Sequence, residues 1–319
     1  MTNNKIDFFV VGYPRSGTTL TASLLARNPD IYVSPETHFF RNFLPSIQNI
    51  KNKEAIVHAF INDKRLSDIG ITPHDLEKYS PDDDEITWLL NTALSIKAKE
   101  QHKSIIGEKT PAHMMYYEEI IKYYPNSKYI VIIRDGRDCV FSNIKEQWTF
   151  SNPIKHAAEW NHYMDKYYKL KKKVGVNICV ARYEDILENP EEQVRKITEF
   201  VGGTFYNRQI KKDESKSVIP DWEKSWKSKA AEAPDNQNKY KWRLHQDKNL
   251  LMALTFIMRK NLDNHFYDTS LIKHASILKR AFFYFRYFIY LPNVYPHMKK
   301  LATTSLYRNL KYIQYNISK

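Results

Sequence analysis

The segment from Gly12 to Thr19 has the composition of a loop that binds an anion. It reads Gly-Tyr-Pro-Arg-Ser-Gly-Thr-Thr and lies between an apolar, strand-like run at residues 8–11 and a helix-like run at 18–26. A glycine-rich turn from a strand into a helix presents backbone N–H groups and the positive end of the helix dipole to an anion. We therefore expect a phosphate- or sulfate-binding loop. The residues that would contact the anion are Arg15, Ser16, Gly17, Thr18 and Thr19.

Arg15 is the only cation in this loop. An ATP-binding P-loop carries a lysine just before the hydroxyl residue that holds Mg²⁺, whereas Thr18 occupies that lysine position here. The planar guanidinium of Arg15 suits a tetrahedral oxyanion, and a sulfuryl group of low charge could be held in this way without a metal. The loop therefore predicts a phosphosulfate nucleotide as ligand, with no metal. The alternative is a structural turn that contains two glycines by chance.

A second anion contact is predicted after the apolar run at 129–133. Arg134 follows this run directly, at the edge where open α/β sheets bind ligands, and Ser142 lies two helical turns further on. These two side chains could share a phosphate. The alternative is a salt bridge from Arg134 to Asp135 or Asp138 that caps the helix.

The alternation of strand and helix patterns predicts the fold. The apolar runs at 8–11, 129–133 and 178–181 are continuous, which is typical of strands covered on both faces. Shorter strand candidates lie at 31–33 and 104–106, and helical patterns lie at 86–97, 114–124, 136–145, 154–174 and from residue 190 to the Gly202-Gly203 stop. We expect an α/β fold with a three-layer parallel sheet of P-loop NTPase-like topology.

The composition excludes several classes of protein. Of the 319 residues, 42% are hydrophobic and 27% are charged, which argues against a disordered, collagen-like or coiled-coil chain. Cys139 and Cys179 show neither a disulfide framework nor a Cys/His metal spacing, so a reducing compartment is favoured. No signal-peptide pattern precedes Phe8. We therefore expect a cytoplasmic protein.

These segments together resemble sulfotransferases that use 3'-phosphoadenylyl sulfate (PAPS). The segment at 13–20 resembles their 5'-phosphosulfate loop, and Arg134 with Ser142 resembles their 3'-phosphate motif. The run Pro-Glu-Thr-His-Phe-Phe at 35–40 is similar to the catalytic-glutamate segment of heparan-type carbohydrate sulfotransferases, and Glu-Lys-Thr-Pro-Ala at 108–112 resembles their lysine motif. The loop followed by Glu36 also resembles protein-tyrosine sulfotransferases. The resemblance extends over residues 8–243.

The resemblance implies roles for residues near the loop. Glu36 would be the general base that accepts the proton of the acceptor hydroxyl, with His38 as the reserve candidate. Arg15 and Lys109 would stabilise the charge that develops on the bridging oxygen of the departing phosphate. The alternatives are a structural role for His38 in its loop and a solvated Lys109 next to Glu108.

Two further elements resemble nucleotide contacts of this family. Tyr183 follows the run at 178–181 and would lie near the nucleotide, although a core tyrosine and a helix cap at Asp185 would explain the same letters. Lys241 and Trp242 resemble the basic-aromatic element that closes over the 3'-phosphate and base. The glycine that usually precedes this element is missing, since Tyr240 stands there.

The last fifty residues differ in charge from the rest of the chain. Residues 270–319 hold nine Lys and Arg residues and no acidic residue, in a chain of net charge +13. The apolar and aromatic run at 281–291 is too short to span a membrane. We expect a sulfotransferase domain at 1–269 and a helical basic extension at 270–319. The extension would lie at the inner face of a membrane, or pack on the first domain or on a second copy in a homodimer. Nucleic acid is not expected, because the cations are sparse and no recognition motif accompanies them.

The predicted function is the transfer of a sulfuryl group from PAPS, as co-substrate, to a hydroxyl of a carbohydrate or glycolipid. A protein-tyrosine or small phenol or alcohol acceptor is the alternative within the same chemistry. A nucleotide or sugar kinase is disfavoured by the missing loop lysine, and a non-catalytic, membrane-associated nucleotide-binding module remains a third interpretation. The acceptor is not encoded in the motifs, because acceptor pockets are built from variable loops.

Overall fold

The computed structural model describes residues 6–77, 87–146, 149–211 and 233–295. The chain divides into two compact units, the first formed by residues 1–133 and 169–237 and the second by residues 134–168 and 238–319. Residues 238–269 and the start of the C-terminal extension thus belong to the same unit. The domain boundary expected at residue 269 stays a prediction.

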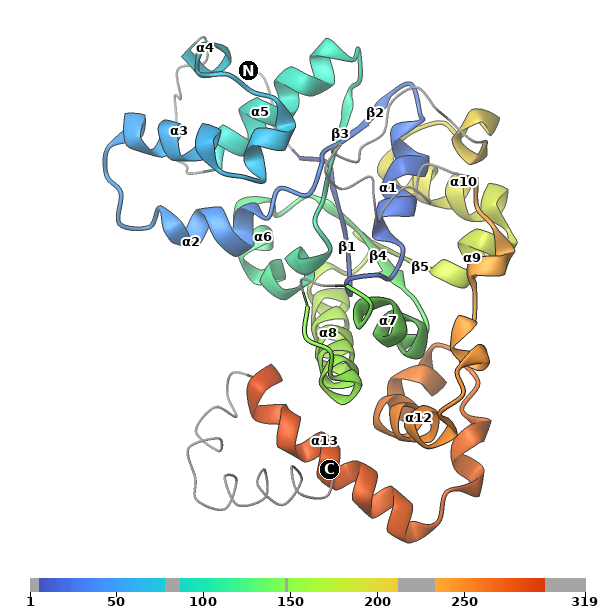
Figure 1. Ribbon diagram of the computed structural model, residues 1–319. Coiled ribbons are helices and arrows are strands. Elements are labelled where there is room, and N and C mark those ends of the chain that lie inside the picture. The colour runs from blue at the N-terminus through green and yellow to red at the C-terminus, as the bar shows by residue number, and fades with distance from the viewer. Residues whose placement is uncertain (1–5, 78–86, 147–148, 212–232, 296–319) are drawn as a thin grey trace. The chain divides into compact units, whose positions relative to one another are not determined.

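The first unit is built on a five-stranded parallel sheet (Figure 1). Its strands are β1 (Phe8–Gly12), β2 (Ile31–Val33), β3 (Ile105–Lys109), β4 (Lys128–Ile133) and β5 (Ile178–Arg182). The strand order is β2-β3-β1-β4-β5, so β1 pairs on one side with β3 and on the other with β4. The predicted parallel α/β sheet is therefore confirmed.

Helices cover both faces of this sheet (Figure 1). Phe8 and Val10 of β1 point to the face covered by α1 and α10 and join the apolar core there. Phe9 points to the opposite face, where its ring lies 6.3 Å from that of Phe40 and 5.4 Å from that of Tyr124. The helices of this unit are α1 (Thr18–Ala26), α2 (Leu44–Ser46), α3 (Lys53–Asn62), α4 (Pro73–Glu77), α5 (Trp88–Glu100), α6 (Tyr117–Tyr123), α9 (Tyr183–Glu188) and α10 (Pro190–Val201).

Local sequence explains where several of these helices begin and end. α10 begins with Pro190, carries two glutamates in its first turn and ends at Gly202, which has a left-handed φ of 97°. These are the favoured residues at both ends of a helix. The helix predicted over 114–124 differs, because a 3-10 turn at Pro111–Tyr116 precedes α6. Pro111 occupies the start of that turn, where a missing N–H costs nothing.

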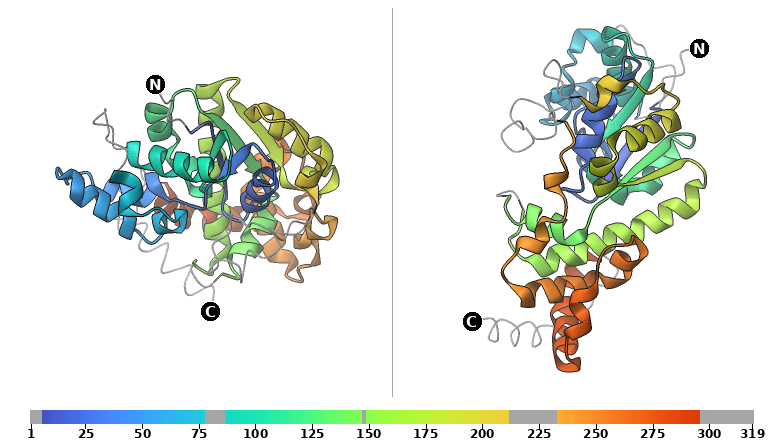
Figure 2. Two further views of the ribbon diagram at one scale, coloured as in Figure 1. Left: turned by 90° about the horizontal axis from the view of Figure 1, so that it is seen from above. Right: turned by 90° about the vertical axis from the view of Figure 1, so that its right-hand side faces the viewer.

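The second unit is helical. Its elements are α7 (Gly136–Asn143), residues 153–168 of α8 (Pro153–Val174), α12 (Lys248–Asn264) and α13 (Ile277–Val294). Side-chain oxygens of Asp135, Asp247 and Ser276 cap α7, α12 and α13 respectively. α12 and α13 lie side by side, in orange and red in Figures 1 and 2. α13 confirms a helix in the C-terminal extension, whose residues 296–319 lie outside the described residues.

Both cysteines are buried and neither forms a disulfide. Burial raises the pKa of the Cys179 thiol, and the nearby Lys196 lowers it to a smaller extent.

Within the described ranges, we find no helix that combines the length and the apolarity of a membrane-spanning segment.

Candidate functional site

The predicted anion-binding loop connects β1 to α1, and space around it requires both of its glycines. Gly17 precedes α1 with φ +100°, and a Cβ at this residue would lie 2.3 Å from the ring of Tyr183. A Cβ at Gly12 would lie 2.6 Å from the carbonyl oxygen of Ile132. Side chains cannot approach other atoms so closely, and L residues rarely adopt the backbone of Gly17. The glycines are therefore required by the local fold and are not a chance feature of the turn.

Several hydrogen-bond donors converge at this loop. α1 has no side-chain cap and no acidic residue in its first turn, and the first N–H groups of a helix have no intrahelical acceptor. Ser16 is 1% exposed, and among the described residues its Oγ has no hydrogen-bond partner. A buried hydroxyl without a partner costs free energy, which a bound anion would recover. Thr18 is also buried, while Thr19 is half-buried.

Arg15 has a backbone conformation that is uncommon for residues other than glycine. Its φ is +70°, in the left-handed region, and its side chain is half-buried. Such conformations are found most often at functional sites, where the surrounding fold holds them in place. Arg15 thus lies in the same loop as the donors, as expected from the sequence.

Glu36 lies between a lysine and a histidine. Lys109 Nζ donates to Glu36 Oε1 over 2.9 Å, and His38 Nε2 lies 3.4 Å from Glu36 Oε2. β2 and β3 are neighbouring parallel strands, so the segment after β2 and the last residue of β3 meet at one edge of the sheet. Lys109 is 1% exposed. The alternative of a solvated lysine next to Glu108 is therefore wrong, because Lys109 is buried and its ammonium is paired with Glu36.

His38 shapes the local backbone and also lies beside Glu36. It has a left-handed φ of 48° and begins a π-helical turn at Phe39–Phe43. Its backbone N–H donates to the Thr110 hydroxyl over 3.2 Å, which ties the segment after β2 to the end of β3. Among the described residues its Nδ1 has no hydrogen-bond partner.

Glu108 is a functional candidate that the sequence reading missed. Its buried carboxylate accepts hydrogen bonds from Thr37 over 2.8 Å and from Thr110 over 2.6 Å, and contacts His113 Nδ1 at 2.9 Å. Burial alone would raise the pKa of Glu108, but the charge of His113 and the three hydrogen bonds outweigh it and hold this pKa below its usual value. Glu108 therefore fixes the segment that carries Glu36. The signal for it was the Glu-Lys pair at the end of a strand, where successive side chains point to opposite faces.

Tyr183 lies at the start of α9, with its ring against Gly17. It is buried, as the core-tyrosine alternative expects, and this packing also places it beside the loop. The predicted cap at Asp185 is wrong, because Arg182 is the residue before α9 and Asp185 lies in the first turn, 3.4 Å from Arg182. Among the residues predicted to contact the nucleotide, Tyr183 is thus brought next to the loop within the first unit.

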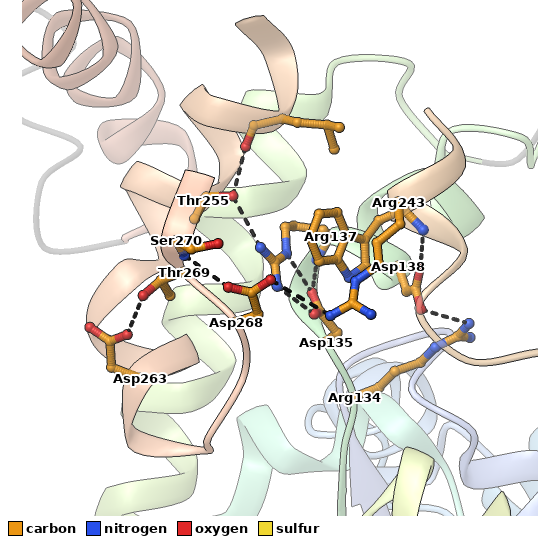
Figure 3. Close-up of polar contacts among 12 residues, drawn as sticks. Arg134, Asp135, Arg137, Asp138, Arg243, Thr255, Asp263, Asp268, Thr269 and Ser270 are labelled. Carbon is orange, nitrogen blue, oxygen red and sulfur yellow. Dashed lines mark hydrogen bonds and ion pairs between the residues drawn. The ribbon is translucent and has the colours of Figure 1, made fainter. Parts of the chain in front are cut away.

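Arg134 belongs to the second unit and contacts an acidic side chain there. Its Nη2 lies 3.6 Å from Asp138 Oδ2 (Figure 3). The same nitrogen donates to the backbone oxygen of Asn238 over 3.2 Å. Burial raises the pKa of Asp138, and Arg134 together with the Trp242 N–H offsets part of this rise. The salt bridge to Asp138, which was the alternative to a phosphate contact, is therefore present. Ser142 lies in α7, and a phosphate shared between Ser142 and Arg134 stays a prediction.

Two charged residues of α7, Asp138 and Arg137, contact Trp242. Its backbone N–H donates to Asp138 Oδ1 over 2.7 Å, and the Arg137 guanidinium lies 3.6 Å from the centre of its ring. Arg137 is also paired with Asp135 over 2.7 Å (Figure 3). Among the described residues, the indole Nε1 of the buried Trp242 has no hydrogen-bond partner.

The 3-10 turn at Lys241–Leu244 follows a tyrosine in place of the expected glycine. Tyr240 has φ +53°, so it adopts the left-handed backbone that glycine would favour. Lys241 is exposed and donates to the Asn238 side chain over 2.7 Å. The backbone at this position is therefore left-handed even though tyrosine replaces the glycine. The roles of Lys241 and Trp242 toward a nucleotide stay predictions.

Within the ranges that the structure describes, no three His, Cys, Asp or Glu side chains are grouped as a metal site requires.

Comparisons with known proteins extend over much of the chain. A model of the sulfotransferase family matches residues 7–207. The protein-tyrosine sulfotransferase of Drosophila melanogaster is 28% identical over 203 residues, which cover 60% of this chain and 37% of the relative. Protein-tyrosine sulfotransferase A of Caenorhabditis elegans is 28% identical over 205 residues, which cover 60% of this chain and 49% of the relative. The chain thus spans less than half the length of these two relatives.

A solved structure has a similar fold. The sulfotransferase domain of the olefin synthase from Synechococcus PCC 7002 matches with a TM-score of 0.61 and 19% sequence identity. The match covers 82% of this chain and 94% of that domain.

Proposed function

The chain belongs to the sulfotransferase family, and from this membership we propose that it transfers a sulfuryl group from PAPS to a hydroxyl group. The observation that carries this proposal is the loop at residues 12–19, which lies inside the matched region and lacks the lysine of an ATP-binding loop. The buried Ser16 hydroxyl and the N-terminus of α1 support an anionic ligand at this loop.

The proposed reaction is a direct transfer. The oxygen of the acceptor hydroxyl attacks the sulfur, a new O–S bond forms, and the bond from sulfur to the bridging oxygen breaks. The bridging oxygen and both electrons of that bond remain on adenosine 3',5'-bisphosphate. Glu36 accepts the hydroxyl proton, so atoms and charge balance without a metal. Arg15 and Lys109 stabilise the charge on the bridging oxygen, which is larger in the transition state than in the ground state.

The resemblance to the family also suggests residues for the rest of the nucleotide. We assign the 3'-phosphate to Arg134 and Ser142, and the closing contacts over the phosphate and base to Lys241 and Trp242. The resemblance of these residues to the 3'-phosphate and closing motifs of the family supports these assignments. Tyr183, whose ring packs on Gly17 of the loop, would also be a nucleotide contact.

We propose a tyrosine side chain in a protein or peptide as the acceptor. The relatives named above are protein-tyrosine sulfotransferases, which favours a phenolic hydroxyl over the carbohydrate or glycolipid first expected from the segment around Glu36. The hydroxyl chemistry is the same in both cases, so Glu36 and Lys109 keep their roles. The two acceptor classes would then differ only in the pocket that binds the acceptor beside Glu36 and Lys109.

A transfer assay with sulfur-labelled PAPS tests the function. Tyrosine peptides, oligosaccharides, glycolipids and small phenols would be offered in parallel to the wild-type chain and to Glu36→Gln. We expect label on the tyrosine peptide with the wild type and its loss with Glu36→Gln. Label on a saccharide alone would overturn the tyrosine assignment but keep the sulfotransferase. Binding of adenosine 3',5'-bisphosphate without turnover on any acceptor would favour a binding module, and Mg²⁺-dependent consumption of ATP would favour a kinase.

A further inference from the structure

α13 is attached to its unit by one face. Phe283 on this face is buried, and the rings of Phe283 and Tyr284 lie 6.1 Å and 6.4 Å from that of Phe256 in α12. Arg280 donates to the backbone oxygens of Ile272 over 3.1 Å and of Ala275 over 3.0 Å, which holds the first turns of the helix in place. The helix is therefore anchored on one side along its length.

The first two turns of α13 also expose apolar side chains to solvent. Ile277 and Leu278 are each 83% exposed, and Phe282 and Tyr284 are exposed as well. These four are half of the exposed large hydrophobic residues among the described parts of the chain, and they lie within eight consecutive positions. Such clustering exceeds the scattered exposure of ordinary surfaces and marks a surface that binds something apolar. Tyr284 partly packs on Phe256 of α12, so we call the other three, Ile277, Leu278 and Phe282, the exposed face of α13.

The charge around this face is strongly positive. Lys273 and Lys279 are exposed next to it, and no acidic residue follows Asp268 in the sequence. The second unit contains twenty of the 49 Lys and Arg residues but only eight of the 36 Asp and Glu residues, so it carries nearly all of the net charge of +13. An apolar surface flanked by these lysines complements a lipid surface, which has anionic headgroups above an apolar interior.

We propose that the exposed face of α13 binds the surface of a bilayer that contains anionic lipids. Ile277, Leu278 and Phe282 would enter the boundary between headgroups and acyl chains, and Lys273 and Lys279 would contact the lipid phosphates. A helix that lies in the interface does not need to cross the bilayer. The proposal concerns attachment and does not depend on sulfuryl transfer.

Vesicle sedimentation with the full chain tests this inference. The vesicles would be phosphatidylcholine alone or with about 30 mol% phosphatidylserine, a composition that gives a clearly negative surface. We expect the wild type to sediment with the anionic vesicles and to be released by salt. Ile277→Ser/Leu278→Ser should bind at least about tenfold more weakly, because two exposed apolar anchors are lost. Lys273→Gln/Lys279→Gln keeps the exposed face but removes two cations. This variant should bind the anionic vesicles more weakly, and its binding to vesicles of phosphatidylcholine alone should equal that of the wild type.

Val176→Ser is the matched control. Val176 is 90% exposed but belongs to the first unit, so its replacement should leave vesicle binding unchanged. Failure of the wild type to bind anionic vesicles, or equal binding by Ile277→Ser/Leu278→Ser, would overturn the proposal. Sedimentation velocity without vesicles tests whether this face binds a second copy of the chain. A dimer that becomes a monomer in Ile277→Ser/Leu278→Ser, with no vesicle binding by either, would assign this face to a second copy of the chain instead.

Discussion

The Lys109 ammonium donates to the Glu36 carboxylate over 2.9 Å at the edge of the sheet where β2 and β3 end. Lys109 is almost fully buried and the Glu36 side chain is 12% exposed, so each neutralises the other in a place with little water. In the proposed reaction the two have opposite tasks, since Glu36 accepts a proton and Lys109 stabilises a departing oxygen. Their contact holds both groups in position.

Replacing Glu36 by glutamine tests its task as the general base. Glutamine keeps an oxygen that can accept from Lys109 but cannot take up the acceptor proton. We expect turnover to fall by about 10²- to 10⁴-fold. Donor affinity should change little, because the phosphate contacts are in the loop. Turnover is measured with labelled PAPS, and affinity by calorimetry with adenosine 3',5'-bisphosphate. Glu54→Gln, at an exposed position of α3, is the control, and near-normal turnover in Glu36→Gln would remove Glu36 from the mechanism.

Replacing Lys109 by methionine tests charge stabilisation in the transition state. Methionine fills similar space without the ammonium, so we expect turnover to fall by about 10²- to 10³-fold, as for loss of a single donor to a developing oxyanion. The exposed Lys51→Met serves as the matched control. The turnover assay with labelled PAPS and calorimetry with adenosine 3',5'-bisphosphate separate an effect on turnover from an effect on donor binding. A variant that loses donor affinity in proportion to turnover would show that Lys109 binds the ground state, contrary to the proposal.

Glu108 should make stability depend on pH. Its pKa is lower in the folded chain than the ordinary value of 4.5, because the charged form is paired with His113 and hydrogen-bonded by Thr37 and Thr110. This stabilisation is fully present above the ordinary pKa and is lost as the pH falls through the lowered folded pKa. We expect Glu108→Gln to lower the free energy of unfolding by about 2 kcal/mol at neutral pH, with the difference shrinking under acid.

Urea unfolding of wild type, Glu108→Gln and the exposed control Glu54→Gln, from neutral pH to below the ordinary pKa of 4.5, measures the effect. The control should differ from wild type by no more than about 0.5 kcal/mol. A deficit of Glu108→Gln that stays constant as the pH falls would contradict the assignment.

The loop and the strands of the first unit were predictable because their signals are local. The bounds of α1 and β2 agree with the sequence prediction, since a continuous apolar run and a glycine turn act within a few residues. The Glu36–Lys109 contact is different, because its partners lie 73 residues apart and meet only when β2 pairs with β3. Glu108 and Lys109 look like a solvated pair in the sequence. The alternation of β3 instead sends their side chains to separate partners in the segment after β2.

Gly17→Ala should weaken donor binding by at least about tenfold. The new Cβ would need a left-handed backbone and would overlap the Tyr183 ring, so the loop or the ring must move away from its present position. Gly175→Ala is a matched control, because Gly175 also has a positive φ, of 56°, but nothing lies within 4 Å of its would-be Cβ. Calorimetry with adenosine 3',5'-bisphosphate compares the two. Equal affinity in Gly17→Ala and wild type would place the donor away from this loop.

The last prediction concerns the buried Arg137, whose guanidinium contacts Asp135 through two bonds of 2.7 and 3.0 Å and stacks on Trp242. Arg137→Met removes the cation that is paired with the buried Asp135 carboxylate, so the free energy of unfolding should fall by about 3 to 5 kcal/mol. Arg195→Met removes an exposed arginine that bonds Glu191 at the same distance of 2.7 Å, and should cost less than about 1 kcal/mol. Urea unfolding of both variants decides the matter. Equal losses would mean that burial adds nothing to the Asp135–Arg137 pair. If the prediction holds, Asp135→Asn/Arg137→Met should recover part of the loss, because the uncompensated charge is then gone.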